Sequence, residues 1–248
     1  MKSKFLIYPF VLLLCLVFSC KSSVQNNKQE TEKKPEYNVL SEEESKEGWQ
    51  LLFDGKTSNG WRNFNGDILS GWIVEDGCLV GLGKGGDIGG DIVSTGQYKY
   101  FILSWDWKLG PMGNSGVMYH VLEGEKYKAP YETGPEYQMI DDDNYEFVLE
   151  DWQKTASDYA MYVADSTKTL NVGEWNSSKI VYSSEKAEYW LNGEKVVEFV
   201  PGSDDWKQRR NSGKWDQYPD YGLAETGHLS LQDHGSKVWF RNIKIKAL

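Results

Sequence analysis

From Gly48 to the C-terminus, the chain is a succession of short apolar or alternating segments, each closed by Gly, Asn, Asp or Pro. Segments such as YFILSWDWKL, SGVMYHVL, AEYWL and VWFRNIKI are rich in the β-branched and aromatic residues that favour strands. No repeat and no long apolar helix separates them. Short strands in such a series pack as two antiparallel sheets, so we predict an all-β sandwich with one or two short helices.

Local signals in the sequence place several turns and helix starts. The dipeptides Asn-Gly at 192–193 and Asp-Gly at 76–77 each lie between two strand-like segments, where they favour tight hairpins. Ser41 followed by Glu44 has the spacing of a capping box, which predicts a short helix before Gly48. Ser203 is a suitable cap for a second helix in the segment Ser203–Trp215.

The N-terminus is typical of an exported lipoprotein. A basic start and a short apolar run end in VFSC, which resembles a lipobox and is too short for a membrane-spanning helix. We predict a signal peptide over residues 1–19, lipidation of Cys20, a flexible tether over 20–40 and one folded domain over 41–248. The protein would then lie in the periplasm or at the outer membrane of a Gram-negative-type bacterium, with the lipid as its only membrane contact.

Charge and cysteine content argue against a nucleic-acid-binding protein and against a disulfide-stabilised domain. The chain has 27 Lys and Arg against 37 Asp and Glu, a formal charge of −10, so a phosphate backbone would be repelled and we expect no nucleic-acid partner. Cys15 would leave with the signal peptide and Cys20 would be acylated, which leaves Cys78 without a disulfide partner. The core must therefore hold the domain together.

Three segments combine an apolar face with a polar one. In GHLSLQDHG, Leu229 and Leu231 project to one side, while the other side has His228, Ser230, Gln232 and His234. The same test applied to NSGVMYH and PEYQMI gives two further polar rows. If these rows share one outer sheet face, seven side chains converge on a groove suited to a sugar: Asn114, His120, Glu136, Gln138, His228, Gln232 and His234.

Several segments also carry a family resemblance. WQLLFDGKTSNGW, WIVEDGCL, NSGVMYHV, GPEYQMIDD, GEWN, YWLNGEKV and GHLSLQDHGSKVWFRNIKI resemble, in order, the signature segments of a bacterial family. That family was long known as a domain of unknown function and is now called the 3-keto-disaccharide hydrolase domain. The resemblance implies a concanavalin A-like jelly-roll sandwich that acts on 3-keto-glycosides, working after an oxidoreductase that oxidises the sugar C3 hydroxyl. One departure is His120, where many members have arginine.

The implied substrate suggests a mechanism. A ketone at C3 makes the C2 proton acidic, so a base can remove it, the group at C1 can leave by β-elimination, and water can add to the product. We expect His234, Glu136 and His120 to be catalytic, with His234 or Glu136 as the base. Substrate-binding residues would be Asn114, Gln138, Gln232, His228 and Lys84, the last on a glycine-rich loop.

Two alternatives remain open at this stage. The same groove could belong to a carbohydrate-binding lipoprotein without catalytic activity, because the outer face of a sandwich is polar in any case. The run Asp141–Asp143 could bind Ca²⁺ or a similar divalent metal through Asp141 and Asp143, or it could be a solvated turn with side-chain caps. The sequence requires no cofactor.

Overall fold

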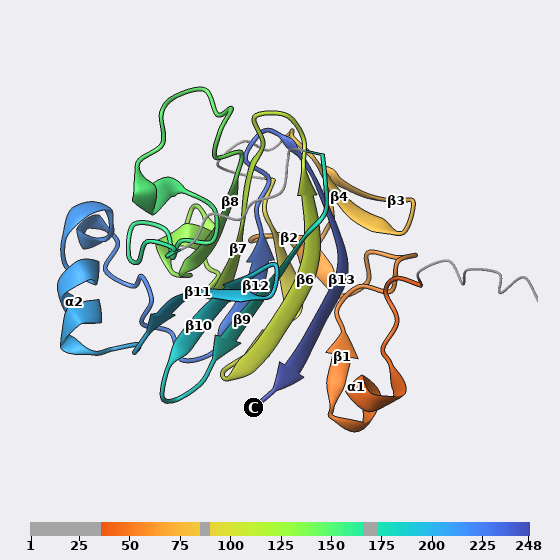
Figure 1. Cartoon of the computed structure of the whole chain (residues 1–248), viewed down its shortest axis with the longest axis horizontal. Helices are drawn as coiled ribbons and strands as arrows, with labels where there is room; N and C mark the ends of the chain where they lie inside the picture. Colours follow the sequence, from red (N-terminus) through yellow and green to blue (C-terminus); the bar gives the residue numbers. More distant parts are fainter. Residues whose placement is uncertain (1–35, 85–89, 166–172) are drawn as a thin grey trace, which may run out of the picture. The chain divides into compact units, whose positions relative to one another are not determined.

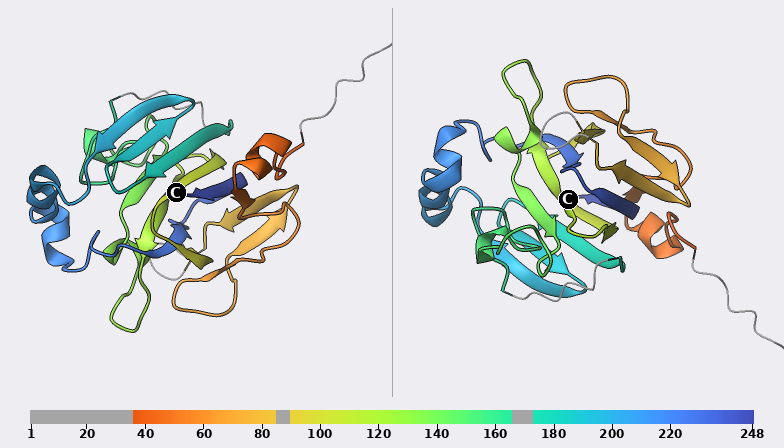
Figure 2. Two further views of the ribbon diagram at one scale, coloured as in Figure 1. Left: turned by 90° about the horizontal axis from the view of Figure 1, so that it is seen from below. Right: turned by 90° about the horizontal axis from the view of Figure 1, so that it is seen from above.

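The computed structural model describes residues 36–84, 90–165 and 173–248. Cys20 and the predicted signal peptide lie outside these residues, so lipidation stays a prediction. Within the described residues, two antiparallel sheets pack face to face (Figure 1, Figure 2). The predicted all-β sandwich is confirmed.

The larger sheet contains eight strands. Their order is β11 (Glu194–Phe199), β10 (Ala187–Leu191), β9 (Asn176–Tyr182), β6 (Phe101–Leu109), β13 (Lys237–Ala247), β4 (Cys78–Leu82) and β3 (Trp72–Glu75), with β1 (Trp49–Leu51) also paired to β13. The smaller sheet has the order β2 (Trp61–Asn63), β5 (Ile92–Tyr98), β12 (Gly227–Leu231), β7 (Asn114–Val121) and β8 (Glu136–Ile140). Some neighbours, such as β3 and β4 or β10 and β11, are consecutive hairpin strands, whereas others, such as β13 with β4 and β6, come from distant parts of the chain.

Helices are short and peripheral among the described residues. They are α1 (Glu42–Lys46), α2 (Asp204–Arg210) and the 3-10 turns η1 (Pro130–Glu132), η2 (Asp151–Gln153) and η3 (Gly213–Gln217). In Figures 1 and 2, α2 lies to one side of the sheets and α1 to the other. None of the described helices is long and apolar enough to cross a bilayer.

The core lies between the two sheets and is built by strict alternation. In β6, every second side chain from Phe101 to Leu109 is buried, and the residues between them are half-buried. Trp105 and Trp107 are each only 1% exposed. Truncation of either indole to alanine would remove about 3–5 kcal/mol of stability.

The local predictions hold. Residues 192–193 and 76–77 adopt the left-handed backbone of type I′ turns and join β10 to β11 and β3 to β4. Ser41 and Glu44 form the capping box of α1, and the hydroxyl of Ser203 accepts a hydrogen bond from the N–H of Trp206 in α2. Asn38, inside the expected tether, is buried and exchanges two hydrogen bonds with Asn242, so the folded unit begins before Ser41.

Candidate active site

A polar pocket of about 210 Å³ lies on the outer face of the smaller sheet. Its walls come from β7, β8, the segment after β12, and the turns around η1, η2 and η3. Five of the predicted site residues line it together with three others: Asn114, Tyr131, Glu136, Gln138, Tyr159, Lys214, Gln232 and His234. The structure thus brings polar residues of the consecutive strands β7 and β8 together with Gln232 and His234, which follow the distant strand β12.

Strand pairing sets the relative positions of these side chains. Gly116 of β7 lies opposite Gln138 of β8, and Met118 lies opposite Glu136. The main chain of Gln232 donates to the carbonyl of Gly116, while its own carbonyl accepts from the Ser115 hydroxyl. The three strands are therefore held in one register at the pocket floor.

Gly116 makes room for the carboxylate of Glu136. A Cβ atom at position 116 would lie 2.1 Å from Oε1 of Glu136, well inside any contact distance. The glutamate side chain, which is only 4% exposed, therefore lies across the neighbouring strand. Any side chain at position 116 would push this carboxylate out of place.

The amides offer hydrogen-bond acceptors to a ligand. Asn114 donates through Nδ2 to the Tyr145 hydroxyl at 3.2 Å, and Gln138 accepts through Oε1 from the main chain of Met139. Within the described residues, the buried oxygens Oδ1 of Asn114 and Oε1 of Gln232 have no hydrogen-bond partner. Buried acceptors are costly unless paired, so both amides have hydrogen-bonding capacity that the surrounding residues do not use.

The loop after β12 presents His234. Its anchor is the adjacent Asp233, a buried residue whose N–H donates to Asp91 and whose carboxylate accepts from the N–H groups of Gly235 and Lys84. His234 itself is half-buried in the pocket wall. Lys84 meets this loop only through its main chain, its side chain is exposed, and it does not line the pocket.

Sequence reasoning missed Tyr131, Tyr159 and Lys214. The ammonium of Lys214 lies 5.1 Å from the ring centre of Tyr131, 4.4 Å from that of Tyr159 and 4.8 Å from that of Trp215. Aromatic faces at these distances attract a cation. The three residues come from segments without strand periodicity, so no pattern in the sequence could direct them to the pocket.

His120 does not share the face of Asn114, and that prediction is wrong. Between the pairs Met118–Ser230 and Val121–His228, two residues of β7 oppose one of β12, and His120 has a φ of +55°. This bulge turns the imidazole away from the pocket, and its Nε2 donates to the carbonyl of Lys99. Burial lowers the pKa of His120, which favours the neutral form of the ring.

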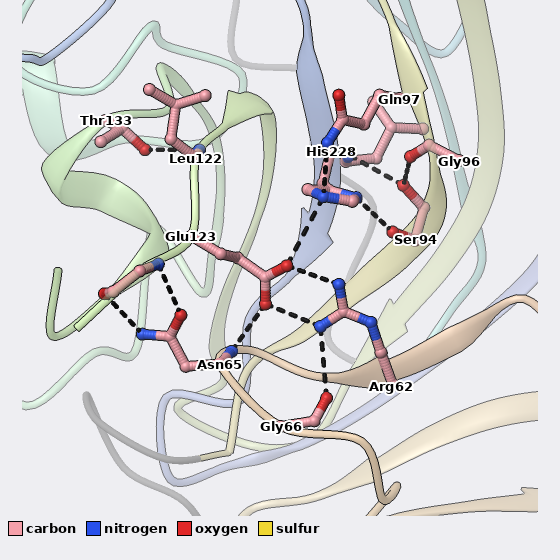
Figure 3. A network of polar contacts seen from close by, with 12 residues as sticks. Arg62, Asn65, Gly66, Ser94, Gly96, Gln97, Leu122, Glu123, Thr133 and His228 are labelled. Carbon is pink, nitrogen blue, oxygen red and sulfur yellow. Dashed lines mark hydrogen bonds and ion pairs between the residues drawn. The ribbon is translucent and has the colours of Figure 1, made fainter.

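His228 also lies outside the pocket, in a separate polar network (Figure 3). Its Nδ1 donates to the carbonyl of Ser94 at 2.6 Å, and Nε2 lies 2.9 Å from the Gln97 amide. Oε2 of Glu123 lies 3.5 Å from Nε2 of His228, and the Arg62 guanidinium donates to both carboxylate oxygens of Glu123. The contacts join β2, β5 and β12 to the end of β7.

The acidic run after β8 forms a capped turn. Asp141 accepts from the main chain of Asn144 and from that of Met112, while Asp143 is exposed. Asp141 thus acts as a side-chain cap. Among the described residues, no group of three or more His, Cys, Asp or Glu side chains is arranged to hold a metal ion.

Directly behind β8 lies a buried acid that sequence analysis did not single out. Asp158 pairs with Tyr137 through its main chain and is 0% exposed. Burial raises the pKa of Asp158 well above its usual range; the nearby Tyr189 hydroxyl opposes this rise and the charge of Glu136 adds to it. The carboxyl is therefore protonated over a pH range in which an exposed aspartate is ionised.

Comparisons with known proteins agree with this architecture. A curated protein of Bacteroides thetaiotaomicron named 3-keto-disaccharide hydrolase is 34% identical over 229 residues, which cover 82% of this chain and 79% of the relative. A crystal structure of a candidate glycosyl hydrolase from Parabacteroides distasonis is 55% identical, with a TM-score of 0.82 over 86% of this chain and 100% of that one. A second candidate glycosyl hydrolase from the same organism is 25% identical, with a TM-score of 0.63 over 81% and 99%.

The family match spans nearly the whole folded unit. Residues 48–246 match the domain described as 3-keto-alpha-glucoside-1,2-lyase-like. These residues contain both sheets except Ala247 at the end of β13, and they contain every residue of the pocket. The chain therefore belongs to the 3-keto-alpha-glucoside-1,2-lyase-like domain family.

Proposed function

We propose that this protein cleaves glycosides whose sugar carries a ketone at C3. The observation that carries the proposal is the presence of Glu136 and His234, two groups able to accept and donate protons, in one polar pocket with the cation of Lys214. Membership of the family and the name of the Bacteroides relative support the same substrate class.

The pocket contains the parts that β-elimination requires. A base removes the acidic C2 proton, the negative charge moves onto the C3 oxygen, and the C1–O bond then breaks as the C1–C2 double bond forms. A proton must reach the departing oxygen, and water added at C1 completes a net hydrolysis. One of Glu136 and His234 serves as the base and the other as the acid, while the Lys214 cation stabilises the negative charge that develops on the reacting oxygens, including the departing one.

Recognition of the sugar follows from the amides and rings of the same pocket. The amide side chains of Asn114 and Gln232, which line the pocket, form hydrogen bonds with hydroxyl groups of the sugar. The rings of Tyr131 and Tyr159 offer apolar faces to the C–H groups of a pyranose. The substrate has to be oxidised at C3 beforehand, so a separate oxidoreductase acts upstream, and we retain the exported lipoprotein as the setting.

The test uses the purified protein with a 3-keto-glucoside and its unoxidised parent, with and without EDTA. The expected result is release of the leaving group from the keto compound alone. If EDTA abolishes this release, the reaction also requires a divalent metal. If neither compound reacts while a sugar still binds, the protein is a carbohydrate-binding lipoprotein and the proposal fails.

Exchange of the C2 proton with D₂O separates the base from the acid. The variant that lacks the base, either Glu136→Gln or His234→Gln, should lose both exchange and release. The variant that lacks the acid should still exchange the C2 proton but should no longer release the group at C1. A leaving group that can depart without a proton should still be released by this variant. Glu188→Gln is the matched control, since Glu188 lies on β10 outside the pocket, where it pairs with Lys186 and Lys195. Full exchange and release in both pocket variants would refute the assignment.

A further inference from the structure

A second pocket of about 500 Å³ adjoins the polar one. Its walls come from η2, the loop after it, the end of α2 and the start of η3, and its lining is Trp152, Ala160, Met161, Val163, Arg209, Ser212, Gly213 and Lys214. Lys214 lines both pockets. Trp152 of the second pocket packs edge-on against Tyr159 of the first, with ring centres 5.2 Å apart.

The two pockets differ in size and in chemistry. The polar pocket, at about 210 Å³, is smaller than the roughly 300–1,000 Å³ typical of sites that enclose a whole drug-sized ligand. One sugar ring can occupy it, but the group attached at C1 has to lie elsewhere. The adjoining pocket is within that size range, and half of its lining side chains are apolar.

The polar groups of the second pocket are already bonded within the protein. The indole N–H of Trp152 donates to Glu150, and the Ser212 hydroxyl donates to the carbonyl of Arg209. The guanidinium of Arg209 is bound to Asp205 and to the carbonyl of Met161. A second sugar would bring several hydroxyl groups into a space with few free partners, whereas a planar apolar group would lose no hydrogen bonds there.

We propose that this pocket, defined by Trp152, Met161 and Val163, binds an aromatic leaving group, so that the enzyme favours aryl 3-keto-glycosides over disaccharides. The inference rests on the proposed function, because it places the sugar ring in the polar pocket. The scissile C1–O bond then crosses from one pocket to the other beside Lys214. The ammonium of Lys214 is thereby placed next to the departing oxygen.

The test compares two 3-keto-glucosides of the same anomeric form, one with a 4-nitrophenyl leaving group and one with a glucosyl leaving group. Val163→Asp puts a charge on the apolar wall at a side chain that is 52% exposed, so the fold should tolerate it. We expect KM for the aryl substrate to rise about tenfold relative to that of the disaccharide, the effect of losing a modest apolar contact. Val148→Asp, at a 95% exposed valine outside both pockets, is the control and should change neither KM.

A binding measurement keeps the two proposals distinguishable. The unoxidised 4-nitrophenyl glucoside, which is not cleaved in the proposed reaction, should bind the wild-type protein and bind Val163→Asp more weakly in calorimetry. Equal binding to both proteins overturns the aromatic subsite, as does an equal rise of KM for both substrates or a larger rise for the disaccharide. If the wild-type protein cleaves neither keto substrate, the proposed function is refuted instead. Binding of the unoxidised 4-nitrophenyl glucoside, measured by calorimetry, then still shows whether the pocket binds an aromatic group.

Discussion

Replacement of Asp158 by asparagine should stabilise the protein, and the gain should increase with pH. Burial raises the pKa of this carboxyl more than the nearby Tyr189 hydroxyl lowers it, and the carboxyl has no ion-pair partner among the described residues. In the unfolded chain the same group ionises near its ordinary pKa of about 3.9. The native state therefore binds a proton that the unfolded state releases.

The magnitude follows from proton linkage. A group whose native pKa is raised contributes its full stability below the unfolded pKa and loses it as the pH rises toward the native pKa. Each pH unit in that interval costs about 1.4 kcal/mol of the free energy of unfolding. Asparagine has nearly the same shape and carries no titrating proton. The difference between Asp158→Asn and the wild type should thus grow by about 1.4 kcal/mol per pH unit above about pH 4, and level off at the native pKa.

Urea unfolding followed by tryptophan fluorescence, repeated over a series of pH values, measures this slope directly. Asp143→Asn, at an exposed aspartate in the turn after β8, is the matched control for the substitution itself. Parallel pH profiles for Asp158→Asn and the wild type would refute the reasoning. So would a variant less stable than the wild type at neutral pH, because Asp158 would then be ionised and paired.

Three further predictions concern the polar network and the pocket. Although burial raises the pKa of Glu123, hydrogen bonds from Arg62 and from a main-chain N–H lower it overall, so Glu123→Gln should cost about 1–3 kcal/mol at neutral pH. This loss of stability should fade as the pH falls through the native pKa of Glu123. Urea unfolding of both proteins at neutral and acidic pH measures it, and a loss that does not change with pH would contradict the prediction. Gly116→Ala should displace the Glu136 carboxylate and reduce kcat/KM about 100-fold with little change in thermal melting, and undiminished activity would argue against the proposed geometry. Lys214→Gln should slow a glucosyl leaving group more than a 4-nitrophenyl one in steady-state assays, whereas equal slowing would exclude a role at the departing oxygen.

The elements that depend on near neighbours were predictable from sequence. The Asn-Gly turn at 192–193 and the Ser41 cap follow from the backbone and side-chain preferences of a few adjacent residues. Alternation in NSGVMYH and PEYQMI correctly assigned Asn114 and Glu136 to a polar face, because the pleat of an unbroken strand alternates regardless of its partner.

Alternation failed where register depends on another strand. One extra residue in β7 opposite β12 creates the bulge at His120, and nothing within NSGVMYHV reveals it, because a bulge is a mismatch between two strands far apart in the chain. His228 lies on a polar strand face, yet its contacts with Ser94 and Glu123 place it outside the pocket.

The sequence by itself determined the two-sheet sandwich, the family and the polar faces of β7 and β8, because these depend on local pattern and ordered motifs. Only the tertiary structure decided which polar residues share a pocket. Lys214 and Tyr159 reach it from irregular segments, whose positions are set by packing such as the stack of Trp215 on Tyr221, with ring centres 3.8 Å apart. Contacts of this kind join residues without a common period, so they arise only when the whole chain is folded.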